Sequence, residues 1–245
     1  MNNRSVALVV LGVFLTILFP GCLPKVDYQT QSFDIGEASV LSGKQLRFIA
    51  RDFIVEKRSL TPGYSREIFD QTSLPTDPTN HQHIDFSQSD PFALSLPSSS
   101  EFAYFGRLHA DLFIGSDGTI SFGGQGTGNS DLVGFFLSDQ ISLLPVDATV
   151  EGSATSYALF EDGIIITYQN VNGNTFQCEL DLGANQRFNI TITYAVVDGN
   201  TRAGVVGLAD SIGYTRNLNP TESDVLHLLD TYYVESDLLQ STSEW

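Results

Sequence analysis

The stretch Leu112-Phe-Ile-Gly-Ser-Asp-Gly-Thr-Ile-Ser-Phe-Gly123 has two short apolar runs separated by the pair Asp117-Gly118. Aspartate and glycine both tolerate the positive φ that a tight hairpin turn requires. Successive side chains of a strand point to opposite faces of a sheet, and we take Phe113, Ile120 and Phe122 to lie on the buried face. The stretch therefore predicts an antiparallel β-hairpin with one face in the protein interior.

Similar short apolar segments recur from Phe92 onward, separated by Gly, Asn and Asp, and a second hairpin turn is predicted at Asp162-Gly163. Short strands at near-regular spacing are typical of antiparallel sandwiches and barrels. We predict an all-β fold, an antiparallel β-sandwich of two packed sheets with an irregular N-terminal extension. The predicted interior comprises Phe113, Ile120, Phe122, Leu144, Phe176, Cys178 and Ile190. The aromatic residues that we expect in the core rather than on a carbohydrate-stacking platform are Phe122, Phe160, Tyr168 and Phe176.

Composition and the placement of turn-forming residues divide the chain into four expected parts. Residues 1–21 are expected to be a signal peptide, and 22–91 a tether and N-terminal extension that is partly strand. Within that extension, residues 45–50 and 52–56 predict a strand pair and 61–78 predict loops. Residues 92–215 are expected to form the β-sandwich domain, and 216–245 a C-terminal segment that packs on or trails it.

The N-terminus has the features of a secretory signal: a positive charge at Arg4, an apolar run over residues 6–19, and the small residue Gly21 before Cys22. The run is shorter than the roughly 20 residues that a permanent membrane helix needs. The end of this segment resembles the bacterial lipobox, in which a small residue precedes a cysteine that is acylated and becomes the mature N-terminus. The resemblance implies lipidation of Cys22 and attachment to a membrane through acyl chains. The alternative is an ordinary signal peptide followed by simple secretion.

The positions of the two cysteines and the net charge limit the classes of partner that we expect for the protein. The second cysteine, Cys178, alternates with polar neighbours and is expected on a buried strand face, which makes it a poor disulfide partner for Cys22. The chain has 29 acidic against 12 basic residues, a formal net charge of −17. Nucleic-acid binding requires Lys and Arg clusters. We therefore expect no nucleic-acid partner and no docking on anionic lipid by charge.

The order of several motifs resembles a known family. Phe102-Ala-Tyr-Phe-Gly106 precedes the 112–123 hairpin, and later segments follow at residues 141–147, 163–171, 174–177, 204–208 and 233–238. This order is similar to that of secreted bacterial β domains of nidogen-like type, over about residues 92–209. The resemblance implies an extracellular adhesion or scaffolding module, usually without known catalysis. The acidic run that the family often carries after the 141 region is reduced here to Asp147.

Few residues of the sequence suggest a catalytic, metal-binding or phosphate-binding site. His81, His83 and Asp85 stand at alternate positions, so an extended chain would direct two imidazoles and a carboxylate to one side, as a divalent metal requires. A solvated approach to the next strand explains them more simply, and His109 and His227 are isolated in sequence. Asp117 could contact calcium but needs no such role as a turn former. Residues 123–128 echo a phosphate-binding loop without the helix and lysine that should follow.

We therefore predict no catalytic residue, no cofactor and no metal, and expect that the protein is not an enzyme. The favoured function is a non-catalytic cell-envelope lipoprotein or secreted module with a structural, adhesion or partner-binding role. Its partner would be an envelope protein or a glycan. The alternative is a secreted metal-dependent hydrolase or carbohydrate-binding module whose residues meet only in three dimensions. A filled two-sheet sandwich favours the first function, and a cleft with clustered acids and histidines the second.

Overall fold

The computed structural model describes residues 29–33, 37–50, 64–97, 101–105, 107–124, 138–182, 188–198, 201–202 and 204–209. This part of the chain contains fifteen β-strands and two short 3-10 helices, η1 (Glu37–Leu41) and η2 (Pro78–Asn80), but no α-helix. The predicted signal peptide, Cys22, His227 and the segment 216–245 lie outside the described residues.

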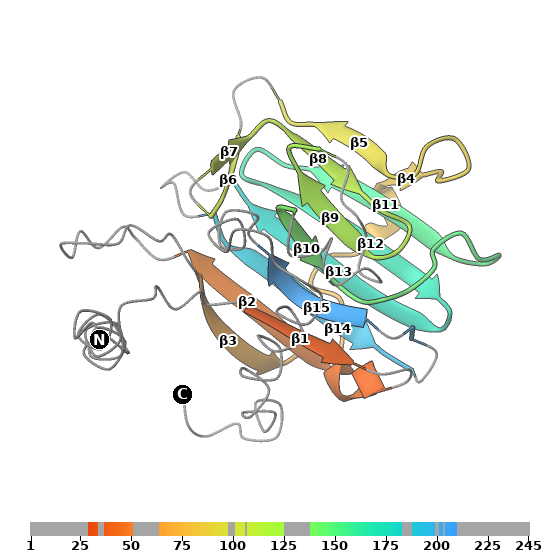
Figure 1. The fold of residues 1–245 in the computed structure, drawn as a ribbon. Helices are drawn as coiled ribbons and strands as arrows, with labels where there is room; N and C mark the ends of the chain where they lie inside the picture. The colour runs from red at the N-terminus through yellow and green to blue at the C-terminus, as the bar shows by residue number, and fades with distance from the viewer. Residues whose placement is uncertain are drawn as a thin grey trace, which may run out of the picture.

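Two antiparallel sheets face each other (Figure 1). The six-stranded sheet has the order β1 (Gln29–Phe33), β15 (Gly204–Ala209), β10 (Gln140–Ser142), β9 (Thr119–Phe122), β8 (Asp111–Ile114) and β5 (Phe92–Ser95). The seven-stranded sheet has the order β3 (Tyr64–Asp70), β2 (Lys44–Ala50), β14 (Ile190–Val196), β13 (Asn174–Asp181), β12 (Gly163–Val171), β11 (Ala154–Leu159) and β4 (Gln82–Ile84). The predicted antiparallel β-sandwich is confirmed.

A third, two-stranded unit consists of β6 (Phe102–Tyr104) and β7 (Arg107–His109), which pair with each other. We call this unit the β6–β7 ribbon. It lies beside one end of the sandwich, at the upper left of Figure 1.

The segment N-terminal to residue 92, expected as tether and extension, contributes β1 to one sheet and β2, β3 and β4 to the other. Strand β2 matches the predicted strand at 45–50, whereas residues 52–56 lie outside the described residues. The prediction of loops over 61–78 is wrong at its start, where β3 pairs with β2. Strand β3 forms the edge of its sheet among the described residues. Of its described side chains only Tyr64 is buried, so the segment lacks the apolar alternation that marks a strand.

The hairpin predicted at Asp117-Gly118 joins β8 to β9. The Gly115 amide donates to the Thr119 carbonyl at 2.8 Å, and Gly118 has a φ of +83°. The turn predicted at Asp162-Gly163 joins β11 to β12, where the Phe160 amide donates to the Gly163 carbonyl. Both turns lie where their sequences indicate.

The side chains between the sheets form one hydrophobic core. Six of the seven residues predicted there are buried: Ile120, Phe122, Leu144, Phe176, Cys178 and Ile190. The exception is Phe113, which is only half-buried. The register pairs Leu112 with Phe122 and Ile114 with Ile120, and directly opposed residues share a face. Because Ile120 and Phe122 face the core, Leu112 and Ile114 do too, and Phe113 points outward.

The expectation of core packing is also wrong for Phe160. Its side chain is 46% exposed, because the residue follows the end of β11 and lies in the turn to β12. The alternation of side chains between the two faces of the sheet ends with β11, so it does not direct the side chain of this turn residue into the core.

Buried tyrosine hydroxyls tie the two sheets together. Tyr168 of β12 donates to the Gly115 carbonyl beside β8 at 2.7 Å, and Tyr194 of β14 donates to the Leu143 carbonyl after β10 at 2.6 Å. Burial raises the pKa of both phenols well above the ordinary value, which keeps them protonated donors. These bonds satisfy polar groups inside an apolar core and fix how the sheets sit on each other.

The outer face of the seven-stranded sheet carries a row of residues that is polar except at its β3 end. The register aligns one residue from each strand across the whole sheet: His83, Ser156, Thr167, Gln177, Thr193, Gln45 and Phe69. The Gln177 amide binds both the backbone nitrogen and the carbonyl of Thr76, at 3.2 and 3.0 Å. The chain between β3 and β4 therefore crosses this face and is bound to its centre.

Candidate functional site

The structure does not build a site around the histidine pair. His81 caps the end of η2, and Asp77 acts on it electrostatically. His83 is exposed on β4, and Asp85 accepts hydrogen bonds from the Ser87 amide and the Gln88 side chain. Burial lowers the pKa of His81, and Asp77 opposes that shift. Among the described residues, no group of three or more His, Cys, Asp or Glu side chains is arranged to hold a metal.

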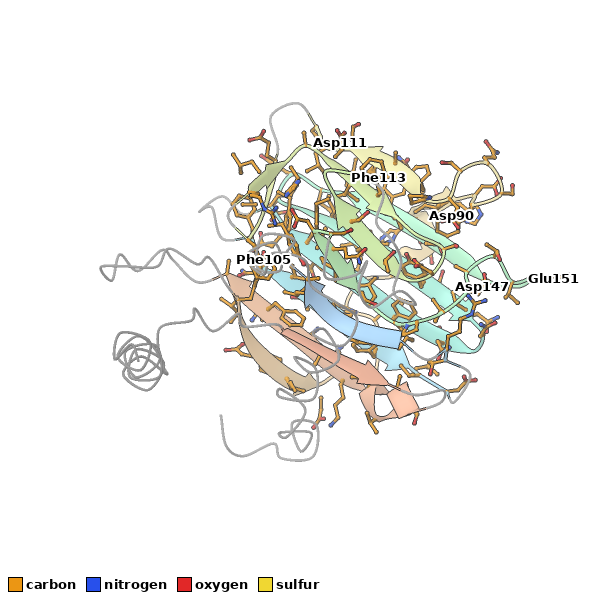
Figure 2. The ribbon with its side chains drawn as sticks, viewed as in Figure 1. Asp90, Phe105, Asp111, Phe113, Asp147 and Glu151 are labelled. Atoms are coloured by element: carbon orange, nitrogen blue, oxygen red, sulfur yellow. The ribbon has the colours of Figure 1, made fainter. Side chains whose placement is uncertain are left out.

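Asp117 acts as a turn residue. Its Oδ1 accepts from the amide and the hydroxyl of Thr119, at 3.1 and 2.6 Å. Asp147 makes the same pair of bonds with Thr149 and an ion pair with Arg202. The bonds to Thr149 lower the pKa of Asp147. In Figure 2 Asp147 and Glu151 lie at the right-hand end of the sandwich, away from Phe105.

A different charged cluster forms beside the β6–β7 ribbon. Asp139, just before β10, is 7% exposed and binds the guanidinium of Arg107 on β7. The His109 Nε2 atom lies 3.7 Å from the Asp139 Oδ2 atom, and the His109 side chain is 11% exposed. We call these three residues the Asp139 cluster.

Burial lowers the pKa of His109, the nearby Asp139 carboxylate raises it, and Arg107 lowers it again. The balance favours a neutral imidazole in the folded protein. Arg107 is therefore the main positive partner of the buried carboxylate. A separation of 3.7 Å is too long for a hydrogen bond between His109 and Asp139 in this arrangement.

Sequence reasoning missed this cluster because it regarded His109 as isolated. Asp139 is 30 positions away, just before β10, and it comes near His109 only where β10 pairs with β9 and the β6–β7 ribbon packs against β9. No local motif signals such a contact. In chemical terms the cluster joins a buried acid to two basic groups and holds the β6–β7 ribbon against β10.

Cys178 is fully buried, and burial raises its pKa, so its thiol is a poor nucleophile and a poor disulfide partner. Residues 125–128 of the glycine-rich stretch lie outside the described residues. No helix in the described ranges is long and apolar enough to cross a membrane.

Comparison of the chain with protein-family models, with curated proteins and with solved structures found no match.

We predict that the purified protein contains no stoichiometric zinc or manganese and that His83→Ala changes its stability by less than about 0.5 kcal/mol. The reason is that His83 is exposed and interacts only weakly with Asp85. Elemental analysis after dialysis and urea denaturation check the two parts. Stoichiometric metal that is lost in the His83→Ala variant would contradict the prediction.

Proposed function

We propose that the protein is a non-catalytic module of the cell envelope, attached to a membrane through acyl chains on Cys22, with a structural or partner-binding role. The observation that carries the proposal is the filled interior of the sandwich. Large side chains of the two sheets with almost no exposure occupy the space between them, including Phe48, Tyr168, Phe176 and Tyr194.

The cross-sheet bonds of Tyr168 and Tyr194 support the same function. They connect side chains of one sheet to the backbone of the other, so the two layers are fixed relative to each other. A scaffold of this kind presents its loops, edges and outer faces at constant positions, and surface loops on a rigid scaffold are where binding residues concentrate. A protein partner or a glycan of the envelope would contact these surfaces.

Export and lipidation rest on the N-terminal sequence. An apolar run, Gly21 and Cys22 follow in the order of a lipoprotein signal. The buried thiol of Cys178 leaves Cys22 without a described disulfide partner. Burial of each acyl CH₂ contributes about 0.8 kcal/mol, and two or more chains are needed for stable anchoring. Acyl chains would hold this acidic protein, whose full sequence has a formal net charge of −17, at a surface that repels it.

The motif order that resembles nidogen-like domains supports an extracellular adhesion or scaffolding role. We propose membership of that family on the order of those motifs alone. The hairpin at 112–123 and the strands β12, β13 and β15 correspond to four of the quoted segments.

We expect Cys22→Ser to change the location of the protein. Wild-type protein should sediment with membranes and partition into detergent, and mass spectrometry should find acyl chains on an N-terminal Cys22. The variant should accumulate as uncleaved precursor or as a soluble exported species, because it has no thiol to acylate.

The matched control is Cys178→Ser, which removes the other thiol and should leave membrane attachment unchanged. Wild-type protein that is released freely, with an unmodified N-terminus beyond Cys22, would refute the anchor and leave simple secretion.

A further inference from the structure

The β6–β7 ribbon docks on the sandwich through Tyr104. The Tyr104 hydroxyl donates to the Gln140 carbonyl at 2.7 Å and accepts from the Ala209 amide at 3.1 Å. These two partners lie in β10 and β15 of the six-stranded sheet. One side chain thus joins the ribbon to two neighbouring strands.

Aromatic rings make the apolar part of the same contact. Phe122 of β9 stacks on Phe102 and on Tyr104, with ring centroids 5.3 and 4.4 Å apart. Phe102 and Tyr104 have no exposed surface, and Phe122 is 5% exposed. The ribbon therefore covers an aromatic surface that would meet water if the ribbon moved away.

The charged part of the contact is the Asp139 cluster. Arg107 supplies one positive charge to the buried carboxylate. The His109 Nε2 atom is buried and has no hydrogen-bond partner among the described residues. Among the described residues, the charged groups that act on His109 are Asp139 and Arg107. On its other side the ring faces Gly123, where a Cβ atom in place of the glycine hydrogen would lie 3.4 Å from the His109 Nδ1 atom.

A second positive charge would be poorly tolerated here. The carboxylate of Asp139 is already paired with Arg107, so protonation of His109 adds a second cation beside a single carboxylate among the described residues, in a site largely removed from water. Burial of an uncompensated charge is costly, and the cost is relieved when the group reaches solvent.

We propose that His109 is an acid-sensitive latch, whose protonation releases the β6–β7 ribbon from the sandwich and exposes the aromatic surface of Phe102, Tyr104 and Phe122.

The direction of the effect follows from linkage. The pKa of His109 is below its ordinary value of about 6.5 when the ribbon is docked and returns to about 6.5 when the ribbon is released. The released state therefore binds more protons between these two pKa values. The equilibrium constant for release rises as the pH falls through this window, by up to about tenfold per pH unit.

Hydrogen exchange of the full-length protein at pH 7.5 and pH 5.0, corrected for intrinsic exchange rates, tests the latch. We expect amides of residues 102–104 and 107–109 to exchange at least about fivefold faster at the lower pH, while amides of β12 and β13 change much less. The His109→Gln variant, which cannot gain the proton, should lose this acid response.

The matched control is His81→Gln. His81 also has a pKa lowered by burial but lies at the end of η2, so its replacement should leave the acid response of the ribbon intact. Circular dichroism checks that each variant is folded. An equal acid response in His109→Gln and wild type, or acceleration of all amides together, would overturn the latch.

Discussion

Replacing Phe176 by alanine should lower the free energy of unfolding by about 3–5 kcal/mol, the range for a large aromatic side chain removed from a packed core. Phe176 lies on β13, near the middle of the seven-stranded sheet, and has no exposed surface. Its ring stacks on Tyr168 with centroids 4.8 Å apart and an interplanar angle of 12°. Urea denaturation of the purified variant measures the loss as a lower midpoint at unchanged slope.

The matched control is Phe160→Ala. It removes the same atoms from a side chain that is 46% exposed in the turn between β11 and β12. Its cost should stay below about 1 kcal/mol, since surface changes are usually small. Equal losses for the two variants would mean that Phe176 does not occupy the core position described.

The comparison between Phe176 and Phe160 shows what the sequence could predict. Phe176 and Cys178 alternate with polar residues, so their shared face is evident from the pattern. Leu112, Phe113 and Ile114 are all apolar, and the only polar residue of β8 is Asp111 at its start, so the sequence of β8 marks its outward face weakly. Only its register with β9 decides which side chains face the core, and pairing across a hairpin is a tertiary property.

The edge strand of the seven-stranded sheet, β3, was harder to predict from the sequence for a similar reason. Strand β3 buries Tyr64 and exposes Glu67, Phe69 and Asp70. Its place in the sheet comes from backbone pairing with β2 rather than from an apolar face. Sequence patterns report burial, and an edge strand with little burial gives little signal.

The Asp139 cluster lay beyond sequence reasoning altogether. Its members are ordinary surface-type residues, and nothing near Asp139 in sequence distinguishes it from the other acidic residues. Burial of the carboxylate arises where β10 begins and where the β6–β7 ribbon covers that end of the sheet. Such a site depends on three segments meeting, and none of the three carries a pattern for it.

Replacing Gly118 by alanine should lower the free energy of unfolding by about 2–4 kcal/mol, for two separate reasons. Gly118 has a φ of +83°, which a residue with a side chain adopts at a cost of order 1 kcal/mol. In addition, the new Cβ would lie 2.1 Å from the Leu144 carbonyl oxygen. The Gly118 carbonyl accepts from the Leu143 amide at 2.9 Å, so the segment after β10 cannot withdraw without losing that bond. Displaced backbone adds about 1–3 kcal/mol.

Two further glycine variants separate these contributions in the same denaturation assay. Gly152 has a similar φ of +86°, and its nearest described neighbour, the Asn170 amide nitrogen, is 3.9 Å away, so Gly152→Ala should cost about 1 kcal/mol from backbone strain alone. Gly124 has no described atom within 4 Å and should tolerate alanine within about 0.5 kcal/mol. The loss of unfolding free energy in Gly118→Ala beyond that in Gly152→Ala then measures how closely the β8–β9 turn packs on the chain after β10. A Gly118→Ala variant no less stable than Gly152→Ala would show that the two segments are not in contact, and the position of the hairpin that defines this fold would be wrong.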